Sequence, residues 1–354
     1  MRVGVVYSDV YLRHRPHTSH PESPQRLRSV VDELKKRGVL SKVRLIEPEV
    51  ADERLLELVH DTKYIELVKD FSKRGGGFLD PDTYVCEETY RVALHAVGGV
   101  LKAIDLVLSD VFDAVFCLVR PPGHHVGRYG RALGAPTQGF CIFNNVAIAA
   151  KYLVNIKKID RIAIVDFDCH HGNGTQEVFY YDNSVLYMST HQDPRTIYPG
   201  TGYVDEVGAG DGEGYNINIP LPPFSGDDIY RDVVDNIVTP VLSQYRPSIV
   251  LMSAGYDAHR RDPITNMNLS VNSFTYLVTK IIEVMRQYTR PKLVLALEGG
   301  YGIGLRLGVY STLCTLLEEE CTLEPDTVSD NLTWSYWRRT RSELLRLLSR
   351  YWSM

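Results

Sequence analysis

Short, almost continuously hydrophobic segments alternate with longer helix-like segments along nearly the whole chain. The hydrophobic segments lack in/out alternation, which predicts strands of a parallel sheet that is covered on both faces. Right-handed helical crossovers between such strands give a three-layer α/β/α sandwich with a mainly parallel sheet. The expected strands are 3–7, 114–119, 161–166, 185–189, 249–253 and 293–297, and the expected helices are 24–37, 87–108, 144–155, 227–245 and 270–287.

No long linker, internal repeat or low-complexity tract interrupts this alternation, so we expect one main domain over residues 1–315. Residues 316–354 are expected to form a C-terminal extension. Its aromatic and leucine residues between 334 and 352 predict an amphipathic helix packed on the domain. A helix that binds a partner or a membrane surface is the alternative interpretation.

Thirty-nine basic residues against 44 acidic ones give a net charge of −5, which argues against a general attraction to nucleic acid or anionic membranes. The sequence shows no targeting segment and no run of about 20 apolar residues that could span a bilayer. Its six cysteines are scattered without a CxxC pair, which argues against a disulfide framework. We therefore expect a soluble protein of the reducing cytoplasm.

Polar motifs directly follow four of the expected strands or strand-like segments. In an open parallel sheet, ligands bind beyond the carboxyl ends of the strands, so side chains at these positions can converge. The motifs are RPPGHH at 120–125, DFDCHHGNG at 166–174, GYD at 255–257 and EGGY at 298–301. Each alone has a structural explanation, but the four together predict a functional site at this edge of the sheet.

Asp168 and His170 stand two residues apart, where side chains of an extended segment project to the same side. One metal ion can then take a carboxylate oxygen and an imidazole nitrogen, with Asp257 as a third ligand from another strand end. Two oxygens and one nitrogen, with a position left for water, are typical of a catalytic rather than a structural site. We expect one Zn²⁺ ion per chain, and Fe²⁺ also suits such ligands.

His124 and His125 are candidates for proton transfer, because imidazole titrates near neutral pH. Asp166 is expected to accept a hydrogen bond from one ring and Asn173 from the other. A carboxylate makes an imidazole more basic than an amide does, so the two rings can differ in role. Tyr301 follows two glycines that allow a tight turn, and its hydroxyl can donate to an oxygen that becomes negative when water attacks a carbonyl.

These motifs, in this order, resemble those of the zinc-dependent histone deacetylase family, which includes acetoin-utilisation proteins and acetylpolyamine amidohydrolases. The resemblance runs from about residue 1 to about residue 315, with further matches at HPESPQRL (20–27), GFCIFNN (139–145) and YPGTG (198–202). The opening RPPGHH and the ending GNGTQ look closer to class II than to class I, as in a class II-like prokaryotic member. The resemblance implies the arginase–deacetylase fold, which agrees with the expected sandwich.

The resemblance also implies roles for individual residues. Those at the chemical centre are the zinc ligands Asp168, His170 and Asp257, the general base His125 with the assisting His124, the carbonyl-polarising Tyr301, and the histidine partners Asp166 and Asn173. Those around it are Gly139, Phe140, Tyr198 and Ile264 along an acetyl-lysine tunnel, and Asp166 and Ser189 at a potassium site. Tyr198 departs from the phenylalanine that is usual in the family.

The implied activity is that of a metal-dependent amidohydrolase, which removes an acetyl or related acyl group from a lysine-like amine with a zinc-activated water. Ile264 is apolar where polyamine-selective relatives tend to carry an acid, which favours acetyl-lysine over the alternative, an acetylpolyamine or other small acetylated amine. A ureohydrolase with two manganese ions is disfavoured, because Gly172 and His259 stand where it needs carboxylates. An inactive acetyl-binding module is disfavoured because the candidate ligands, base and tyrosine are all present.

We expect no direct nucleic-acid or membrane partner and leave open whether the chain forms a homo-oligomer. Residues 126–138 follow a candidate catalytic histidine and are therefore expected at the mouth of the site. Arg128 and Arg131 in this loop could attract an anionic group of the substrate; a solvated loop is the competing interpretation.

Overall fold

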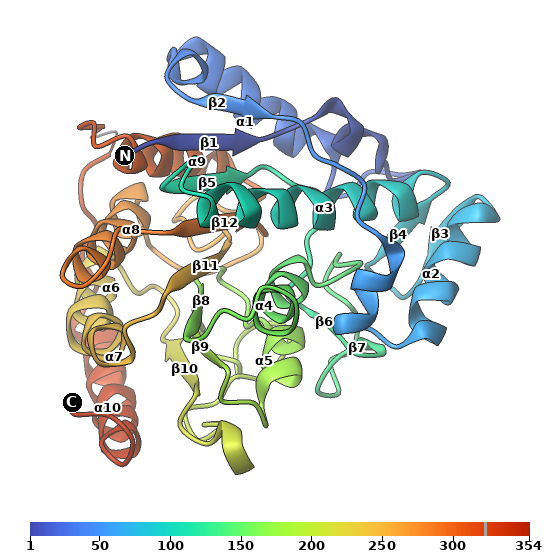
Figure 1. The fold of residues 1–354 in the computed structure, drawn as a ribbon. Coiled ribbons are helices and arrows are strands. Elements are labelled where there is room, and N and C mark those ends of the chain that lie inside the picture. Colours follow the sequence, from blue (N-terminus) through green and yellow to red (C-terminus); the bar gives the residue numbers. More distant parts are fainter. Residues whose placement is uncertain (322–323) are drawn as a thin grey trace.

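A computed structural model describes residues 1–321 and 324–354 as a three-layer α/β/α sandwich (Figure 1). An eight-stranded sheet forms the middle layer, and neighbouring strands in it are parallel. From edge to edge the strands are β10 (Asn216–Leu221), β9 (Val185–Gln192), β8 (Ile162–Asp166), β11 (Ile249–Ala254), β12 (Leu293–Leu297), β5 (Ala114–Cys117), β1 (Val3–Val6) and β2 (Arg44–Ile46). The predicted fold class is confirmed.

The two edge strands, β2 and β10, were not predicted from the sequence. β2 has three residues, and β10 alternates asparagine with isoleucine instead of being continuously apolar. Its asparagines are nevertheless buried, because the amides of Asn216 and Asn218 donate to the side-chain oxygen of Gln176 at 2.9 and 2.7 Å. A buried polar residue whose amide donates to a partner distant in the sequence leaves no hydrophobic signal.

The helices cover both faces of the sheet (Figure 1). Their bounds are α1 Pro24–Lys36, α2 Thr62–Lys73, α3 Thr89–Leu108, α4 Asn145–Asn155, α5 Asn173–Phe179, α6 Asp227–Val233, α7 Thr239–Tyr245, α8 Val271–Arg286, α9 Ile303–Leu316 and α10 Asn331–Leu348. α1, α9, α8 and α7 contact one another in that order, as do α3, α4 and α5 on the other side. The expected helix over 227–245 is continuous, because a π-helical stretch, Val234–Val238, joins α6 to α7.

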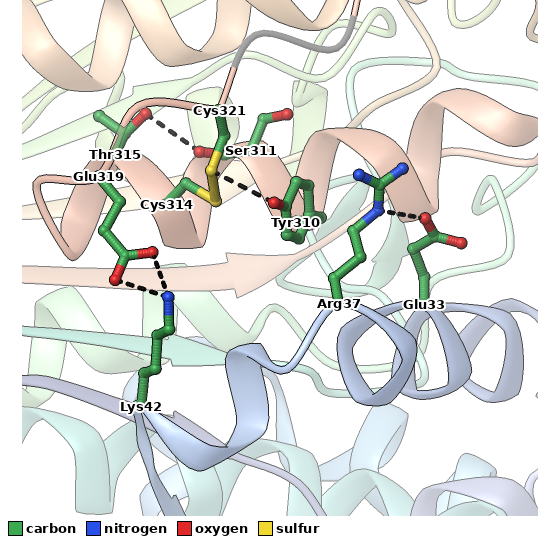
Figure 2. Close-up of a disulfide and its surroundings, with 9 residues drawn as sticks. All are labelled: Glu33, Arg37, Lys42, Tyr310, Ser311, Cys314, Thr315, Glu319 and Cys321. Atoms are coloured by element: carbon green, nitrogen blue, oxygen red, sulfur yellow. Dashed lines mark hydrogen bonds and ion pairs between the residues drawn. A yellow bond between two sulfur atoms is a disulfide. The ribbon is translucent and has the colours of Figure 1, made fainter.

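A disulfide joins Cys314, near the end of α9, to Cys321 (Figure 2). The chain reverses after α9, and an ion pair of 2.8 Å between Glu319 and Lys42 fastens the reversed segment. The Cα atoms of the two cysteines consequently lie 6.1 Å apart, within the range of a disulfide. The scattered spacing did not predict this single bridge, and the other four cysteines, Cys86, Cys117, Cys141 and Cys169, are free and buried.

The C-terminal helix α10 packs with its aromatic side against the body of the protein. Trp337 is fully buried, and the indole N–H groups of Trp334 and Trp337 donate to Asp228 and Asp232, both at 2.7 Å. Whether residues 1–315 form a domain that is separate from residues 316–354 stays a prediction. Among residues 1–321 and 324–354, we find no helix with both the length and the apolar character needed to cross a lipid bilayer.

Candidate active site

The four polar motifs follow four strands that are neighbours in the sheet, in the order β8, β11, β12 and β5. Because these strands are parallel, their carboxyl ends meet along one edge and bring the motifs together. The convergence expected from the sequence therefore has a simple topological origin.

Asp168, His170 and Asp257 meet at this edge, where one ligand atom from each lies within 4.8 Å of the others. The Nδ1 atom of His170 is 3.2 Å from a carboxylate oxygen of Asp168 and 2.9 Å from one of Asp257. All three residues are buried. Burial and the neighbouring Asp168 carboxylate raise the pKa of Asp257, so a cation bound between the two carboxylates would stabilise their ionised forms.

Glycines let the backbone approach these carboxylates closely. A Cβ atom at Gly255 or Gly299 would collide with the carboxylates of Asp168 and Asp257. The amide of Gly299 instead donates to Asp168 at 2.7 Å, and the amide of Cys169 donates to Asp257 at 2.8 Å. Two oriented carboxylates and one imidazole are a donor set that fits a catalytic zinc ion.

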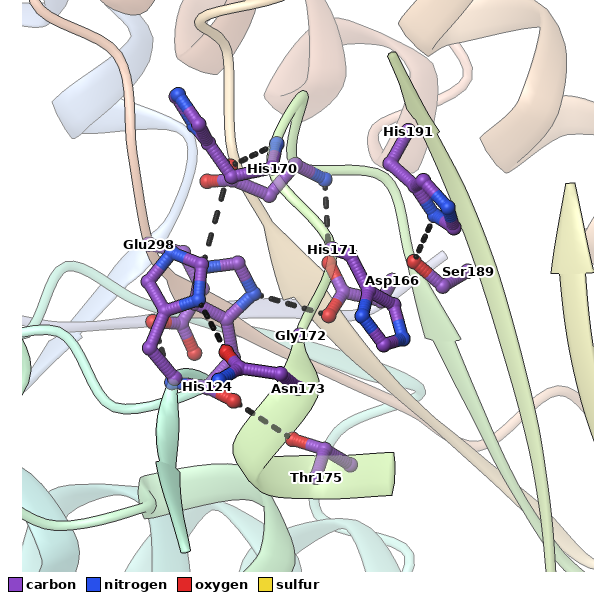
Figure 3. Close-up of polar contacts among 12 residues, drawn as sticks. His124, Asp166, His170, His171, Gly172, Asn173, Thr175, Ser189, His191 and Glu298 are labelled. Atoms are coloured by element: carbon purple, nitrogen blue, oxygen red, sulfur yellow. Dashed lines mark hydrogen bonds and ion pairs between the residues drawn. The ribbon is translucent and has the colours of Figure 1, made fainter. Parts of the chain in front are cut away.

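The two histidines after β5 have different hydrogen-bond partners. Nδ1 of His124 lies 3.0 Å from a carboxylate oxygen of Asp166 (Figure 3), and Nδ1 of His125 lies 2.8 Å from Oδ1 of Asn173. The side-chain amide of Asn173 donates to the Ala132 carbonyl at 2.9 Å, which orients its oxygen toward His125. His125 therefore donates through Nδ1, and its Nε2 is left as the basic nitrogen.

The two rings have opposite protonation behaviour. Burial would lower the pKa of His124, but the Asp166 and Asp168 carboxylates outweigh it and raise this pKa to about 10. Burial and the positive charges of His124 and His170 lower the pKa of His125 well below its usual value. His124 thus holds its proton while His125 stays neutral.

Glu298, directly after β12, holds the backbone at the start of the histidine pair. The sequence did not predict this role. Its carboxylate accepts hydrogen bonds from the amides of Gly123 at 2.7 Å and His124 at 3.3 Å. Burial raises the pKa of Glu298 to about 7. The EGGY motif contains this glutamate, but nothing in the sequence pairs it with residues 123 and 124.

Tyr301 is held on several sides. Its amide donates to Asp262 at 2.7 Å, the guanidinium of Arg26 stacks 4.8 Å from its ring centroid, and the ring of Phe140 meets it edge-on at 5.7 Å. Gly300 before it has a φ of 113°, the region that favours glycine. Burial raises the pKa of Tyr301 well above its usual value, so its hydroxyl stays protonated and able to donate.

A pocket of about 350 Å³ leads to these groups. Its lining includes His125, His170 and Tyr301, the four expected tunnel residues Gly139, Phe140, Tyr198 and Ile264, and two residues that were not predicted, Asp82 and Ile197. Asp82 lies just before β4 (Tyr84–Cys86), which pairs with β3 (Gly76–Phe78) in a small hairpin. Asp82 follows no strand of the central sheet, so its place in the pocket could not be predicted from the strand ends.

The expected potassium ligands Asp166 and Ser189 are register partners on β8 and β9. The Ser189 hydroxyl bonds to Nδ1 of His191 at 2.8 Å (Figure 3), and the Asp166 carboxylate accepts from His124 and from the Tyr187 hydroxyl. The two side chains are thus neighbours, and their joint role toward potassium stays a prediction.

The segment 126–138 forms a hairpin of β6 (Val126–Gly127) and β7 (Gly130–Arg131) beside the site. Arg128 and Arg131 are exposed on it, and Arg128 lines a different pocket together with Leu58 and Val59. The hairpin reaches the site instead through the Ala132 carbonyl, which orients Asn173.

Comparison with known proteins agrees with this geometry. The histone deacetylase domain model matches residues 20–315. A probable deacetylase of Archaeoglobus fulgidus is 39% identical over 98% of this chain and 95% of that protein. The histone deacetylase-like amidohydrolase of Pseudomonas aeruginosa is 35% identical over 80% of this chain and 72% of that protein.

The likeness extends to a solved structure. The crystal structure of the HDA15 HD domain superposes with a TM-score of 0.87 and 30% sequence identity, over 99% of this chain and 95% of that one. Since the family model spans most of the sequence and includes all four motifs, the chain belongs to the histone deacetylase family and is a deacetylase.

Proposed function

We propose that this deacetylase hydrolyses the amide bond between an acetyl group and a lysine-like amine, with one Zn²⁺ ion held by Asp168, His170 and Asp257. The observation that carries the proposal is that one ligand atom from each of these residues lies within 4.8 Å of the others. His170 also lines the pocket, so the ligand cluster is at the pocket's inner end. When bound, such an ion acts as a Lewis acid toward the carbonyl and the attacking water. Fe²⁺ suits the same donors.

The two histidines are proposed to divide proton transfer between them. His125 lines the pocket and is kept neutral, which suits it to take the proton of the attacking water as general base. His124 is kept protonated by Asp166, which suits it to stabilise negative charge that develops nearby and to assist the return of a proton to the leaving amine. The Asn173 contact fixes the hydrogen of His125 on Nδ1 and leaves Nε2 to accept the proton.

Tyr301 is proposed to donate from its hydroxyl to the carbonyl oxygen as that oxygen becomes negative. Its raised pKa keeps the hydroxyl protonated, and its place in the pocket lining brings it to the substrate. The backbone contacts to Asp262 and the ring contact with Phe140 limit its motion, so little reorganisation is needed during the reaction.

The pocket walls support an acyl-lysine substrate. Phe140, Tyr198, Ile197 and Ile264 offer apolar surface to a methylene chain, and Tyr198 keeps its hydroxyl bonded to the Thr137 carbonyl at 2.9 Å. The second candidate is an acetylpolyamine, which one observation favours: the carboxylate-bearing Asp82 lines the same pocket and could face a second ammonium group.

A binuclear manganese ureohydrolase is not proposed, because His259 is already engaged by the protein. Its Nε2 lies 2.9 Å from Glu324, and its Nδ1 accepts from the Arg261 amide at 3.2 Å. At Gly172, a Cβ atom would collide with Asp166, so the backbone there has no room for a metal-binding side chain.

Three further properties stay proposals. Asp166 and Ser189 are proposed to contribute to a K⁺ site, residues 1–315 to form the catalytic domain, and the cell's cytoplasm to be the location. The four free cysteines support a reducing compartment, and the Cys314–Cys321 disulfide counts against it. Acetylated amines, rather than nucleic acid or membranes, are the proposed partners.

A hydrolysis panel tests the proposal. Acetyl-lysine peptides, acetylpolyamines and longer acyl-lysine peptides are assayed with and without a chelator, with metal content determined in parallel. We expect chelator-sensitive release of acetate, fastest from acetyl-lysine peptides, and one ion per chain. Faster turnover of acetylpolyamines would move the assignment to the second candidate, and chelator-insensitive turnover would remove the metal from it.

A further inference from the structure

Glu324 lies in the C-terminal segment, beyond the residues that match the family model, yet it is buried beside the active-site region. Its carboxylate receives hydrogen bonds from His259 at 2.9 Å and from the guanidinium of Arg260 at 3.0 Å. It also accepts from the amide of Val271 at 3.2 Å, at the start of α8. Helix N-terminal amides favour an anion, so this carboxylate joins the helix to the segment 259–260.

The imidazole of His259 is fixed in one tautomer by these contacts. Because its Nδ1 accepts from the Arg261 amide at 3.2 Å, its Nε2 carries the hydrogen that Glu324 accepts. On its other side the ring packs against the backbone of α9, where a Cβ atom at Gly304 would collide with it. His259 is therefore clamped between the C-terminal segment and the helix that follows Tyr301.

His259 belongs to the loop from Asp257 to Ile264, and this loop contacts the candidate active site at three points. It begins at the metal-ligand candidate Asp257 and ends at Ile264 in the pocket lining. Between them, Asp262 accepts from the amides of Tyr301 at 2.7 Å and Gly302 at 3.1 Å. The backbone that presents Tyr301 is thus tied to the same loop that Glu324 holds.

We propose that Glu324 is a positioning residue for the deacetylation reaction: it holds the 257–264 loop so that Asp262 sets the orientation of Tyr301. The inference rests on the proposed role of Tyr301. A buried carboxylate with several charge-assisted hydrogen bonds resists displacement, because each bond is stronger than its neutral counterpart. The C-terminal segment then contributes to catalysis without touching the substrate.

Asp326 offers a matched control two residues further on. It forms an ion pair with Arg231 of α6 at 2.8 Å and accepts from the side chain of Asn272 at 2.7 Å. In the part of the chain that the structure describes, no hydrogen bond joins Asp326 to residues 257–264. Asp326→Asn therefore loosens the same segment without reaching the loop.

The test compares Glu324→Gln, Asp326→Asn and the wild type on an acetyl-lysine peptide. We expect Glu324→Gln to lower kcat by about tenfold or more with KM within about twofold, since misplaced catalytic groups cost rate rather than binding. Asp326→Asn is expected to leave both constants within about twofold. Equal losses in the two variants would reduce Glu324 to a general anchor of the segment and overturn the proposal.

A double-mutant cycle separates positioning from general stability. If Glu324 acts through Tyr301, Glu324→Gln costs about tenfold in the wild type but about twofold or less in a Tyr301→Phe background. Additive losses would show that Tyr301 is not the residue through which Glu324 acts, and would reject the proposal. Should Glu324→Gln fail to fold, Arg260→Gln removes one of the same contacts from the more exposed side and enters the same cycle.

Hydrogen exchange gives a readout that is independent of turnover. In Glu324→Gln we expect faster amide exchange in the peptides that cover 257–264 and 299–304, with wild-type exchange in Asp326→Asn. Unchanged exchange in 257–264 overturns the inference even if the activity falls. A wild-type enzyme that hydrolyses no acetylated amine would instead count against the proposed function, while the exchange comparison would still test the clamp.

Discussion

Nδ1 of His124 and a carboxylate oxygen of Asp166 lie 3.0 Å apart, with both residues buried. The adjacent His125 has an amide, Asn173, in the corresponding place at 2.8 Å. Two neighbouring imidazoles thus differ by one charged partner, and this difference accounts for the raised pKa of one and much of the division of labour proposed for them.

Replacing Asp166 by asparagine should change how the rate depends on pH. The pKa of His124 is raised to about 10 with the carboxylate present, so its proton is kept in alkaline solution. Without Asp166 the proton leaves at lower pH, and the alkaline limb of the kcat profile should move down by about 1–2 pH units. We also expect kcat at pH 8 to fall by about 10²-fold. An unmoved alkaline limb would contradict the role given to His124.

The matched control changes the partner of the other ring. Asn173→Asp gives His125 a carboxylate, which raises the pKa of the ring that must be neutral to act as a base. The acidic limb of kcat/KM should then move to higher pH while the alkaline limb stays. If Asn173→Asp instead moved the alkaline limb, the assignments of the two histidines would have to be exchanged.

Removing the hydroxyl of Tyr301 should separate catalysis from metal binding. Tyr301→Phe keeps the ring contact with Phe140 and the stack under Arg26 but loses the donor. By analogy with an oxyanion-hole donor, turnover should fall by about 10²–10³-fold. Metal content and thermal stability, measured on the same preparation, should match the wild type. Turnover within about twofold of wild type would remove Tyr301 from the mechanism.

The two carboxylates of the proposed metal site should affect the stability of the protein after chelation. Asp168 and Asp257 repel each other, and Asp257→Asn removes one of the two charges. After chelation the variant should therefore have a higher Tm than the wild type. Added Zn²⁺ at about 100 times its Kd should stabilise the wild type by about 2.7 kcal/mol and the variant much less. Equal stabilisation of the wild type and Asp257→Asn by Zn²⁺ would show that Asp257 is not a ligand of the ion.

Much of the site could be predicted because its residues directly follow strands. The carboxyl ends of parallel strands meet at one edge of the sheet, and β8 and β11 are neighbours in it. This is enough to predict that the side chains of Asp168, His170 and Asp257 lie close together. The positions of Asp82 and Glu324 could not be predicted in this way. Both residues lie in irregular segments whose contacts depend on how distant parts of the chain pack. Asp82 reaches the pocket from beside a two-stranded hairpin, and Glu324 meets His259 across 65 residues.

The first residue of the RPPGHH motif illustrates a different limit of sequence reasoning. Arg120 does not enter the pocket lining but forms a fully buried ion pair with Glu22. It also donates to the Tyr11 carbonyl at 2.8 Å and to the Tyr84 hydroxyl at 2.9 Å. The histidines at the end of this motif lie at the candidate site, whereas the arginine at its start stabilises the fold. The spacing of the residues alone does not distinguish these two roles.

Breaking this buried pair should cost more stability than breaking an exposed one. Glu22→Gln leaves the Arg120 guanidinium without its counter-charge, and we expect a loss of about 3–5 kcal/mol in the free energy of unfolding. Asp70→Asn, which removes an exposed ion pair with Lys73 on α2, should cost about 1 kcal/mol or less. Chemical denaturation at pH 7 measures both variants.

The same pair should make the stability depend on pH in a defined direction. Burial alone would raise the pKa of Glu22, but Arg120 and His14 outweigh it and hold this pKa well below the ordinary value of 4.5. A carboxyl whose pKa is lower in the folded state stabilises the fold above its unfolded pKa, and this contribution is lost as the pH falls. The wild type should therefore lose stability below pH 4.5 more steeply than Glu22→Gln, which lacks the titrating group. Parallel curves for the two proteins between pH 7 and the acid transition would show that the Glu22 carboxylate is not stabilised by Arg120 in the folded state.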